Sequence, residues 1–164
     1  MLGESLLVAP VFTESGDVDY YLPEGTWTNF LSNKVVEGGK WQHEVHDFMS
    51  LPLMARENSI IAVGADDQNV EYEFGRDLTL HVFALKDSAC ADIKDMYGNN
   101  MLKVCAENKG GKVTFRFDGT AENLSILLRN VDGVSRLSGA EAEKTELGTL
   151  LKVNVGLEDV SFTL

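Results

Sequence analysis

The sequence predicts an all-β fold of two small antiparallel β-sandwich modules in tandem. Short apolar or alternating segments recur along the whole chain, and each fits a strand that is buried on one or both faces. Clusters of Gly, Pro, Asn and Asp separate these segments at short spacing, which is typical of sandwiches. Helical periodicity nowhere extends beyond two turns.

Strand candidates in the first half begin with residues 6–11, which are apolar on both faces and are stopped by turn residues. Residues 17–22 alternate in polarity and then enter a Pro-Glu-Gly turn. The further candidates are residues 27–31, 35–36, 41–45, 51–55, 59–63 and 78–85. Residues 64–75 are polar and irregular, and we expect them to form the longest loop.

A module boundary is expected at Lys86-Asp87-Ser88, because the aromatic content falls there and the pattern becomes a plain meander. This places the modules at residues 1–86 and 87–164. Strands of the second module are expected to end at turns containing Gly or Asn, since these residues tolerate positive φ. The strand candidates are residues 89–97, 101–107, 113–117, 124–131, 153–155 and 160–164. Residues 139–148 are expected to form a charged loop or a single helical turn.

Composition and charge restrict the partners of this chain. Its 164 residues suffice for one or two domains with a buried core, and 44% hydrophobic with 24% charged residues is ordinary for a globular protein. A phosphate backbone or an anionic membrane surface would repel the formal net charge of −12. Nucleic acid and membrane are therefore not expected as partners. A neutral ligand such as a sugar is compatible with this charge.

Two features bear on the compartment. No export signal is visible at Met1, and the apolar run at residues 6–11 is too short for a signal sequence or a membrane span. We therefore expect a cytoplasmic protein. Cys90 and Cys105 are expected to be reduced thiols in the core or at an edge, whereas a disulfide would require adjacent strands to bring them together.

The segment His43-Glu44-Val45-His46-Asp47 is the first cluster of metal-binding residue types. A helical zinc motif needs histidines four residues apart on one helix face, whereas these lie three apart in strand-like surroundings. An odd separation on a strand directs the two side chains to opposite faces. We therefore interpret the segment as a polar strand end, and we expect no metal and no other cofactor.

Acidic residues gather at two other places. Asp17 and Asp19 are expected on one strand face, about 6.7 Å apart along the strand. That separation suits the paired carboxylates of glycoside hydrolysis, but such pairs need different environments so that one carboxyl stays protonated. The second group lacks the regular oxygen spacing of a calcium loop. It consists of Asp66, Asp67, Glu71 and Glu73. Both groups are interpreted as solvated.

Aromatic residues are candidates for stacking on a sugar ring, since flat rings suit the apolar faces of pyranoses. The same rings are also ordinary core residues of a sandwich. Trp27 follows a turn and lies between two threonines, which indicates a strand with one buried face. Core packing is the preferred interpretation, and the candidates kept for substrate binding are Trp41, Tyr20 and Tyr21.

No catalytic residue is predicted. The sequence has no G-x-S-x-G elbow, no phosphate-binding loop and no dinucleotide fingerprint. Its Ser, His and Asp residues form no recognisable motif. We therefore expect a chain without a reaction centre of its own.

Three segments together carry a family resemblance: residues 6–11 (LLVAPV), 21–27 (YLPEGTW) and 51–61 (LPLMARENSII). In this order and at this spacing they resemble the region just after the catalytic barrel of glycoside hydrolase family 31. The resemblance covers roughly the first half of the chain. The second half is similar to the distal β domain of that family by position and strand pattern.

One branch of the family is most similar. The segment WTNFL at residues 27–31, with Gly38-Gly39-Lys40-Trp41 and His46-Asp47-Phe48, looks most like the α-xylosidases. The resemblance implies an enzyme with a (β/α)8 barrel, followed by proximal and distal β-sandwiches. It also implies that two barrel aspartates perform retaining hydrolysis of α-glycosides. None of those barrel loops is represented in this sequence, so no catalytic residue is carried over onto it.

The resemblance leads to one leading function and two alternatives. The chain is expected to be an excised C-terminal piece of an α-xylosidase-like enzyme, inactive alone. Its partner would be the barrel of the same parent chain, packed on an exposed apolar patch of the first module. Other subunits of an oligomeric parent are left open. A carbohydrate-binding module would need two or more exposed, coplanar rings. An adhesion or protein-interaction sandwich would predict export and tandem repeats, which the sequence does not show.

Overall fold

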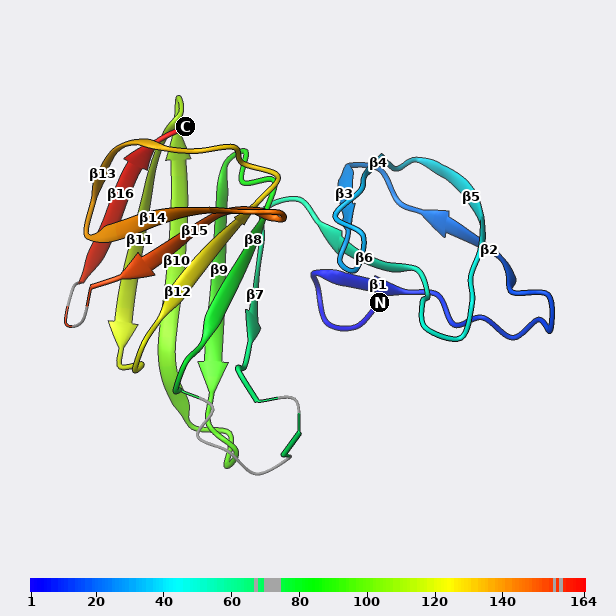
Figure 1. Ribbon diagram of the computed structural model, residues 1–164, viewed down its shortest axis with the longest axis horizontal. Helices are drawn as coiled ribbons and strands as arrows, with labels where there is room; N and C mark the ends of the chain where they lie inside the picture. Colours follow the sequence, from blue (N-terminus) through cyan, green and yellow to red (C-terminus); the bar gives the residue numbers. More distant parts are fainter. Residues whose placement is uncertain (67, 70–74, 155, 157) are drawn as a thin grey trace. The chain divides into compact units, whose positions relative to one another are not determined.

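The computed structural model describes residues 1–66, 68–69, 75–154, 156 and 158–164. All regular secondary structure in those residues is β-strand, as the sequence predicted (Figure 1). The chain divides into two compact units, unit 1 (Met1–Glu57) and unit 2 (Asn58–Leu164). Within the described residues, no helix has the length and apolarity needed to cross a membrane.

Unit 1 consists of a four-stranded antiparallel sheet and a two-stranded ribbon. The sheet has the order β1-β6-β3-β4. Its strands are β1 (Leu6–Val8), β6 (Leu53–Arg56), β3 (Thr26–Asn29) and β4 (Val35–Glu37). The ribbon pairs β2 (Asp17–Leu22) with β5 (Lys40–Val45) in antiparallel register.

Trp27 forms the centre of the core of unit 1. Its side chain is 1% exposed, and the indole Nε1 donates a hydrogen bond to the Pro23 carbonyl oxygen at 2.9 Å. Burial of the ring with a partner for its N–H is what an indole needs in a core. This confirms the expectation that Trp27 is a core residue. The rest of the buried cluster is small and consists of Ala9, Tyr20, Leu22 and Met54.

Unit 2 is a sandwich of two five-stranded sheets that face each other (Figure 1). The first has the order β13 (Ser135–Ser138), β16 (Asp159–Thr163), β11 (Lys112–Gly119), β10 (Asn100–Lys109) and β9 (Ser88–Lys94). The second has the order β14 (Ala140–Thr145), β15 (Gly148–Val153), β12 (Ser125–Arg129), β8 (Thr79–Phe83) and β7 (Ser59–Val63). Inward side chains of both sheets form one core, which includes Leu80, Val104, Phe115, Ile126 and Phe162.

The division into units differs from the boundary expected between residues 86 and 87. β7 and β8 belong to the second sheet of unit 2, because β8 pairs in parallel with β12. At the expected boundary, Asn58 Oδ1 accepts hydrogen bonds from the backbone N–H groups of Lys86 and Asp87 at 2.7 and 3.0 Å. The division between the two compact units therefore falls between Glu57 and Asn58 in the sequence.

Two expectations are corrected in unit 2. Cys90 and Cys105 form a disulfide rather than two reduced thiols, because β9 and β10 place them directly opposite each other. Residues 139–148, expected to be a loop or helical turn, supply β14 and the start of β15. The side chains of β14 are mostly exposed and the strand lies at a sheet edge, so its charges mark a solvent-facing edge strand.

A buried cation lies beside the core of the second sheet. Arg129 on β12 is 3% exposed, with its guanidinium carbon 5.1 Å from the centre of the Phe83 ring. Its Nη1 lies 3.1 Å from Nδ1 of His81 on β8. Burial, together with the positive charge of Arg129, lowers the pKa of His81 to about 4. The imidazole is therefore neutral at pH 7, and its Nδ1 accepts the guanidinium hydrogen bond.

His81 should make stability fall on acidification. The pKa of an unfolded-state histidine is about 6.5, so between about pH 6.5 and 4 the unfolded chain binds a proton that the folded chain does not bind. This should cost about 1–2 kcal/mol of unfolding free energy after allowance for partial exposure of the ring. The free energy of unfolding is measured by urea denaturation near pH 7.5 and near pH 4.5. Between these two pH values it should fall by about 1–2 kcal/mol less in His81→Gln than in the unmodified chain. Equal losses in the two proteins would contradict this role.

Candidate functional site

The ribbon of β2 and β5 separates its side chains into a buried face and an exposed face. Side chains alternate along each strand, and residues directly opposite each other share a face. Tyr20 and Leu22 point into the core of unit 1, at 6% and 0% exposure. The opposite side, which we call the ribbon face, consists of Asp17, Asp19, Tyr21, Trp41, His43 and Val45.

Tyr21 and Trp41 meet on the ribbon face. They are paired in the register, and their ring centroids lie 5.9 Å apart with an interplanar angle of 69°, an edge-to-face contact. Trp41 is 70% exposed and Tyr21 is 47% exposed. The structure thus brings together two of the three predicted binding candidates and leaves most of the tryptophan open to solvent.

Tyr20, the third candidate, lies on the buried side of the ribbon. Its hydroxyl donates a hydrogen bond to Glu44 Oε1 at 2.9 Å. Burial raises the pKa of Tyr20, and the bond to Glu44 and the charge of that carboxylate raise it further. Tyr20 therefore anchors the ribbon to the core and presents no ring to a ligand on the ribbon face.

A histidine and two carboxylates occupy the rest of the ribbon face. His43 Nδ1 lies 3.0 Å from Asp19 Oδ1, and His43 Nε2 lies 3.4 Å from Asp17 Oδ1. All three side chains remain substantially exposed. Asp17 and Asp19 do share one face, as predicted. Their common neighbour is His43, which the sequence had grouped with His46 instead.

Of the second acidic group, the structure describes Asp66 alone, and this residue is not arranged to bind a cation. Asp66 accepts hydrogen bonds from the backbone N–H groups of Gln68 and Asn69, and from the Asn69 side chain, so its oxygens serve its own turn. Its predicted companions Asp67, Glu71 and Glu73 lie outside the described residues. Across the described ranges, no group of three or more His, Cys, Asp or Glu side chains is arranged to hold a metal ion.

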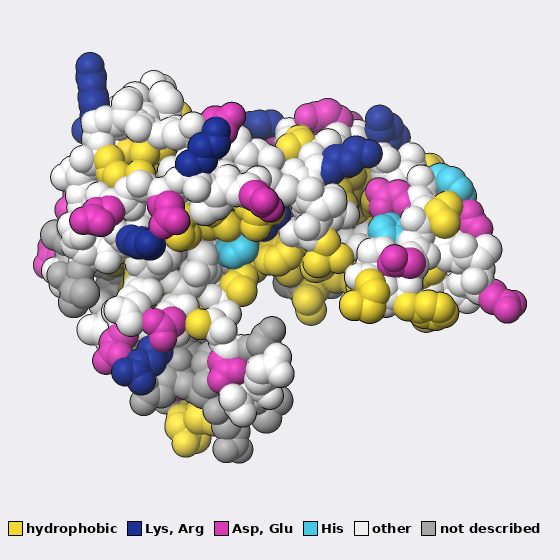
Figure 2. All heavy atoms as spheres, viewed as in Figure 1, with side chains coloured by type: hydrophobic (Ala, Val, Ile, Leu, Met, Phe, Trp, Pro, Cys, Tyr) yellow, Lys and Arg dark blue, Asp and Glu magenta, His cyan; other side chains and the backbone are white. Residues whose placement is uncertain are grey.

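Two loops of unit 1 present large apolar side chains to solvent. Phe12 lies between β1 and β2, while Phe48 and Met49 lie between β5 and β6. Phe12 is 91% exposed, Met49 is 88% exposed and Phe48 is fully exposed. We call these three residues the apolar anchors. Hydrophobic side chains are visible on the surface of unit 1 in Figure 2.

An open groove of about 630 Å³ runs between the same two loops. Phe48 forms part of its wall. The rest of its apolar lining is Val8, Pro10, Val11 and Leu51. Glu14 and Asp47 add charge, so the groove combines an apolar lining with acidic groups. Such a recess suits a protruding side chain of another protein surface.

Asp47 holds the loop between β5 and β6 in a defined turn. Its Oδ1 accepts hydrogen bonds from the Ser50 hydroxyl at 2.8 Å and from the Met49 backbone N–H at 3.0 Å. These bonds lower the pKa of Asp47, the Ser50 bond most strongly. His46 ties the turn to the ribbon, with Nδ1 3.1 Å from Ser50 Oγ and Nε2 2.8 Å from Glu44 Oε2. The backbone of this turn is therefore held in a conformation that exposes Phe48 and Met49 to solvent.

Gly16 brings the two anchor loops together. Its carbonyl oxygen accepts a hydrogen bond from the His46 backbone N–H at 3.0 Å, and its φ is +83°. A Cβ at this position would overlap the His46 carbonyl oxygen. Only glycine therefore allows the loops to approach this closely.

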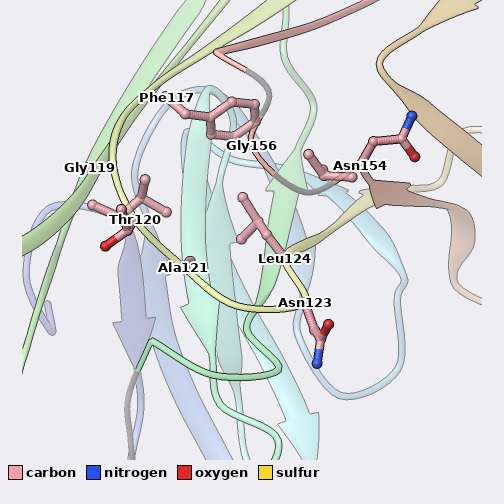
Figure 3. Close-up of a pocket in the computed structure, with 10 residues that line it drawn as sticks. Phe117, Gly119, Thr120, Ala121, Asn123, Leu124, Asn154 and Gly156 are labelled. Atoms are coloured by element: carbon pink, nitrogen blue, oxygen red, sulfur yellow. The ribbon is translucent and has the colours of Figure 1, made fainter.

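Unit 2 contains a smaller pocket of about 210 Å³ (Figure 3). Phe117 and Leu124 line it with apolar surface, and Asn123 and Asn154 add amide groups. Asn123 already donates a hydrogen bond to Asp77 Oδ1 at 2.8 Å. The described lining residues carry no charge, so this pocket supplies no group for acid–base chemistry.

Sequence reasoning missed the apolar anchors as functional residues. Phe48 belongs to the segment that carries the family resemblance, whereas Phe12 and Met49 belong to no predicted motif. A signal was present, because Phe48 and Met49 stand between the turn formers Asp47 and Ser50, outside any alternating segment. A large apolar residue inside a turn is more informative than one within a strand, since a turn offers no core face to bury it.

Comparison with protein families gives two matches that together span most of the chain. Residues 1–61 match the Glycosyl hydrolase family 31 C-terminal domain, and residues 73–164 match the Alpha-xylosidase YicI, C-terminal domain. The chain is 28% identical over 142 residues to Alpha-xylosidase XylQ of Lactiplantibacillus pentosus, covering 84% of this chain and 19% of that protein. It is 39% identical over 71 residues to an Alpha-xylosidase of Emericella nidulans, covering 38% and 9%. The chain thus spans about a fifth or less of the length of these relatives.

Solved structures share this fold. The cycloalternan-forming enzyme from Listeria monocytogenes superposes with a TM-score of 0.80 at 18% identity, over 100% of this chain and 18% of that one. The GH31 dextranase of Flavobacterium johnsoniae gives a TM-score of 0.74 at 16% identity, over 100% and 26%. The GH31 alpha-xylosidase from Xanthomonas citri gives 0.60 at 21% identity, over 79% and 16%. At these identities the likeness concerns the fold.

Gly16→Ala should destabilise unit 1 by disrupting the approach of the anchor loops. The added Cβ overlaps the His46 carbonyl and sits at positive φ. We expect a loss of about 1–3 kcal/mol beyond the cost of positive φ alone. The matched control is Gly3→Ala in the same unit, where φ is +62° and no atom lies within 4 Å. Urea denaturation followed by Trp fluorescence measures both. Similar stabilities for the two variants would contradict the close contact.

Proposed function

The chain belongs to glycosyl hydrolase family 31, and we propose that it is the non-catalytic C-terminal region of an α-xylosidase-like enzyme. We call this region the brace, because its role would be to support the catalytic domain. The family model that matches more than half of it describes an α-xylosidase C-terminal domain. Both sequence relatives described above are named alpha-xylosidases. Such an enzyme would hydrolyse α-glycosides, in particular α-xylosides, with retention of configuration. Its catalytic residues would lie in the much longer part of the enzyme that this chain does not span. The brace would pack on the catalytic barrel of the same parent chain.

The apolar anchors carry this proposal. Phe12, Phe48 and Met49 contribute no burial to unit 1, yet hydrogen bonds hold the turn that exposes two of them. Large apolar side chains that neighbouring loops expose to solvent indicate a contact with another protein surface. Burying such a side chain contributes roughly 1.5–3 kcal/mol. Burial of the three anchors would therefore make a substantial favourable contribution to docking of unit 1 on a partner.

The small core of unit 1 supports the same function. Only five residues form its buried cluster. Seven large hydrophobic side chains of unit 1 outside the ribbon face are exposed, namely Met1, Leu2, Phe12, Leu31, Val35, Phe48 and Met49. A domain of about 60 residues is marginally stable alone. Packing against the catalytic barrel would bury the apolar surface that unit 1 exposes. The same contact would help to stabilise the barrel.

Carbohydrate binding is a second candidate function. One observation favours it: Tyr21 and Trp41 are exposed and in contact on the ribbon face, although their interplanar angle of 69° differs from the coplanar pair expected of a binding module. The two functions use different side chains, because neither ring belongs to the apolar anchors. A brace that also holds sugar would keep substrate near the catalytic part of the parent enzyme.

The isolated chain should bind a hydrophobic dye through the anchors. Fluorescence of 8-anilinonaphthalene sulfonate should rise with the unmodified chain, and the triple variant Phe12→Ser, Phe48→Ser, Met49→Ser should lose about half of that rise or more. Tyr97→Ser is the matched control, because Tyr97 is an exposed aromatic residue in a turn of unit 2. It should keep the signal. An undiminished signal in the triple variant, with circular dichroism unchanged, would argue against the docking surface.

The isolated chain should also be inactive. Incubation of the chain with p-nitrophenyl α-D-xyloside should release no more nitrophenol than the substrate releases in buffer alone. The residues proposed to carry out hydrolysis would lie in the catalytic barrel of the parent enzyme, which this sequence does not include. Hydrolysis at an enzyme-like rate would overturn the proposal. The encoding reading frame gives an independent check, since barrel-coding sequence is expected upstream of Met1. A stop codon and promoter there would contradict attachment to a barrel.

A further inference from the structure

The ribbon face presents two kinds of chemical group in a fixed order. Tyr21 and Trp41 occupy one outward-facing rung, Asp19 and His43 the next, and Asp17 and Val45 the third. Successive outward positions on a strand lie about 6.7 Å apart. An apolar corner formed by the two rings is thus followed directly by hydrogen-bonding groups, within the length of a short oligosaccharide.

We propose that the ribbon face binds a neutral pyranose oligosaccharide. One sugar ring would pack against Trp41 and Tyr21, and hydroxyl groups of the same sugar or its neighbour would bond to Asp19 and Asp17. This inference rests on the second function given above, gives it a site and a ligand class, and does not depend on the brace.

The aromatic pair provides the apolar contact. Trp41 keeps 70% of its surface open, so a large part of the indole is available to the C–H face of a pyranose. The two ring planes meet at 69° and form a corner rather than a coplanar platform. A corner suits one sugar that touches both rings, whereas a coplanar pair would suit two successive sugars. The site should therefore bind with modest affinity and recognise a single ring.

The carboxylates provide the polar contacts. A carboxylate can accept about four hydrogen bonds, and Asp17 and Asp19 each contact His43 through one oxygen, Oδ1. Both side chains are substantially exposed, at 45% and 71%. Acceptor positions therefore remain for sugar hydroxyls, and hydrogen bonds to a charged acceptor are about twice as strong as neutral ones. The hydrogen bond between His43 and Asp19 holds that carboxylate in place before any ligand arrives, which limits the entropy lost on binding.

The charge of the face selects a neutral sugar over other occupants. Two carboxylates on a chain with a net charge of −12 repel phosphorylated sugars, uronates and nucleic acids. The centre of a protein–protein interface is depleted in aspartate, yet here Asp19 and His43 stand on the rung beside the exposed tryptophan. The apolar anchors show the contrasting pattern of a docking surface. A polyhydroxyl ligand with an apolar ring face complements the ribbon face best.

The fluorescence of Trp41 can report the binding of a sugar to the ribbon face. The chain has two tryptophans, and the other, Trp27, is 1% exposed. The probes are cellotetraose, maltotetraose and xylotetraose, each titrated to about 10 mM into the 164-residue chain and followed by tryptophan fluorescence and calorimetry. At least one probe should give a saturable response. Trp41→Ala should weaken that binding about tenfold or more, and Asp19→Ala about threefold to tenfold.

Matched controls separate this site from the anchors. Tyr97→Ala and Phe48→Ala each remove an exposed aromatic ring elsewhere and should leave the affinity unchanged. His43→Ala tests the same face without removing a ring and should weaken binding, so a Trp41 variant that fails to fold does not end the test. No saturable response to any of the three probes would overturn the proposal, and so would an affinity unchanged in Trp41→Ala or lost in Phe48→Ala. The dye assay on the anchors reads out the brace separately.

Discussion

The antiparallel register of β2 and β5 decides what unit 1 buries and what it presents. Tyr21 faces Trp41 in this register, while Tyr20 and Leu22 point inward. A slip of one residue would exchange the two faces, because strand side chains alternate with a period of two. The hydrogen bond from Tyr20 to Glu44 favours the observed register, and Glu44 in turn contacts His46 at the start of the anchor loop. Core, ribbon face and anchor loop therefore depend on one pairing.

Alternation and turn residues were sufficient to predict the strands and their class. The segment of β2 alternates and ends at a Pro-Glu-Gly turn, and the structure places a strand there. Val113 and Phe115 are buried on β11, as their alternation with polar residues indicates. The shared face of Asp17 and Asp19 followed from the same period of two. These features depend on neighbours in sequence, which local patterns can capture.

Features that depend on partners distant in sequence were not predictable in this way. The parallel pairing of β8 with β12 places β8 in the second sheet of unit 2, and no turn signal marks a parallel pair. The disulfide required the register of β9 on β10. At the site, the contact of His43 with the two aspartates required the register of β5 on β2. Each of these registers is set by packing, and composition alone does not specify it.

β12 is an interior strand only because β8 and β7 extend its sheet. A shortened chain beginning at residue 87 would lose both, and would leave the backbone amides and carbonyls of one side of β12 without partners. Ile126, Leu127 and Leu128 on that strand are buried in the intact unit. An open apolar edge of this kind templates strand addition between molecules and leads to aggregation. Insolubility of such a fragment would therefore report a broken sheet, and would carry no information about sugar binding or enzyme support.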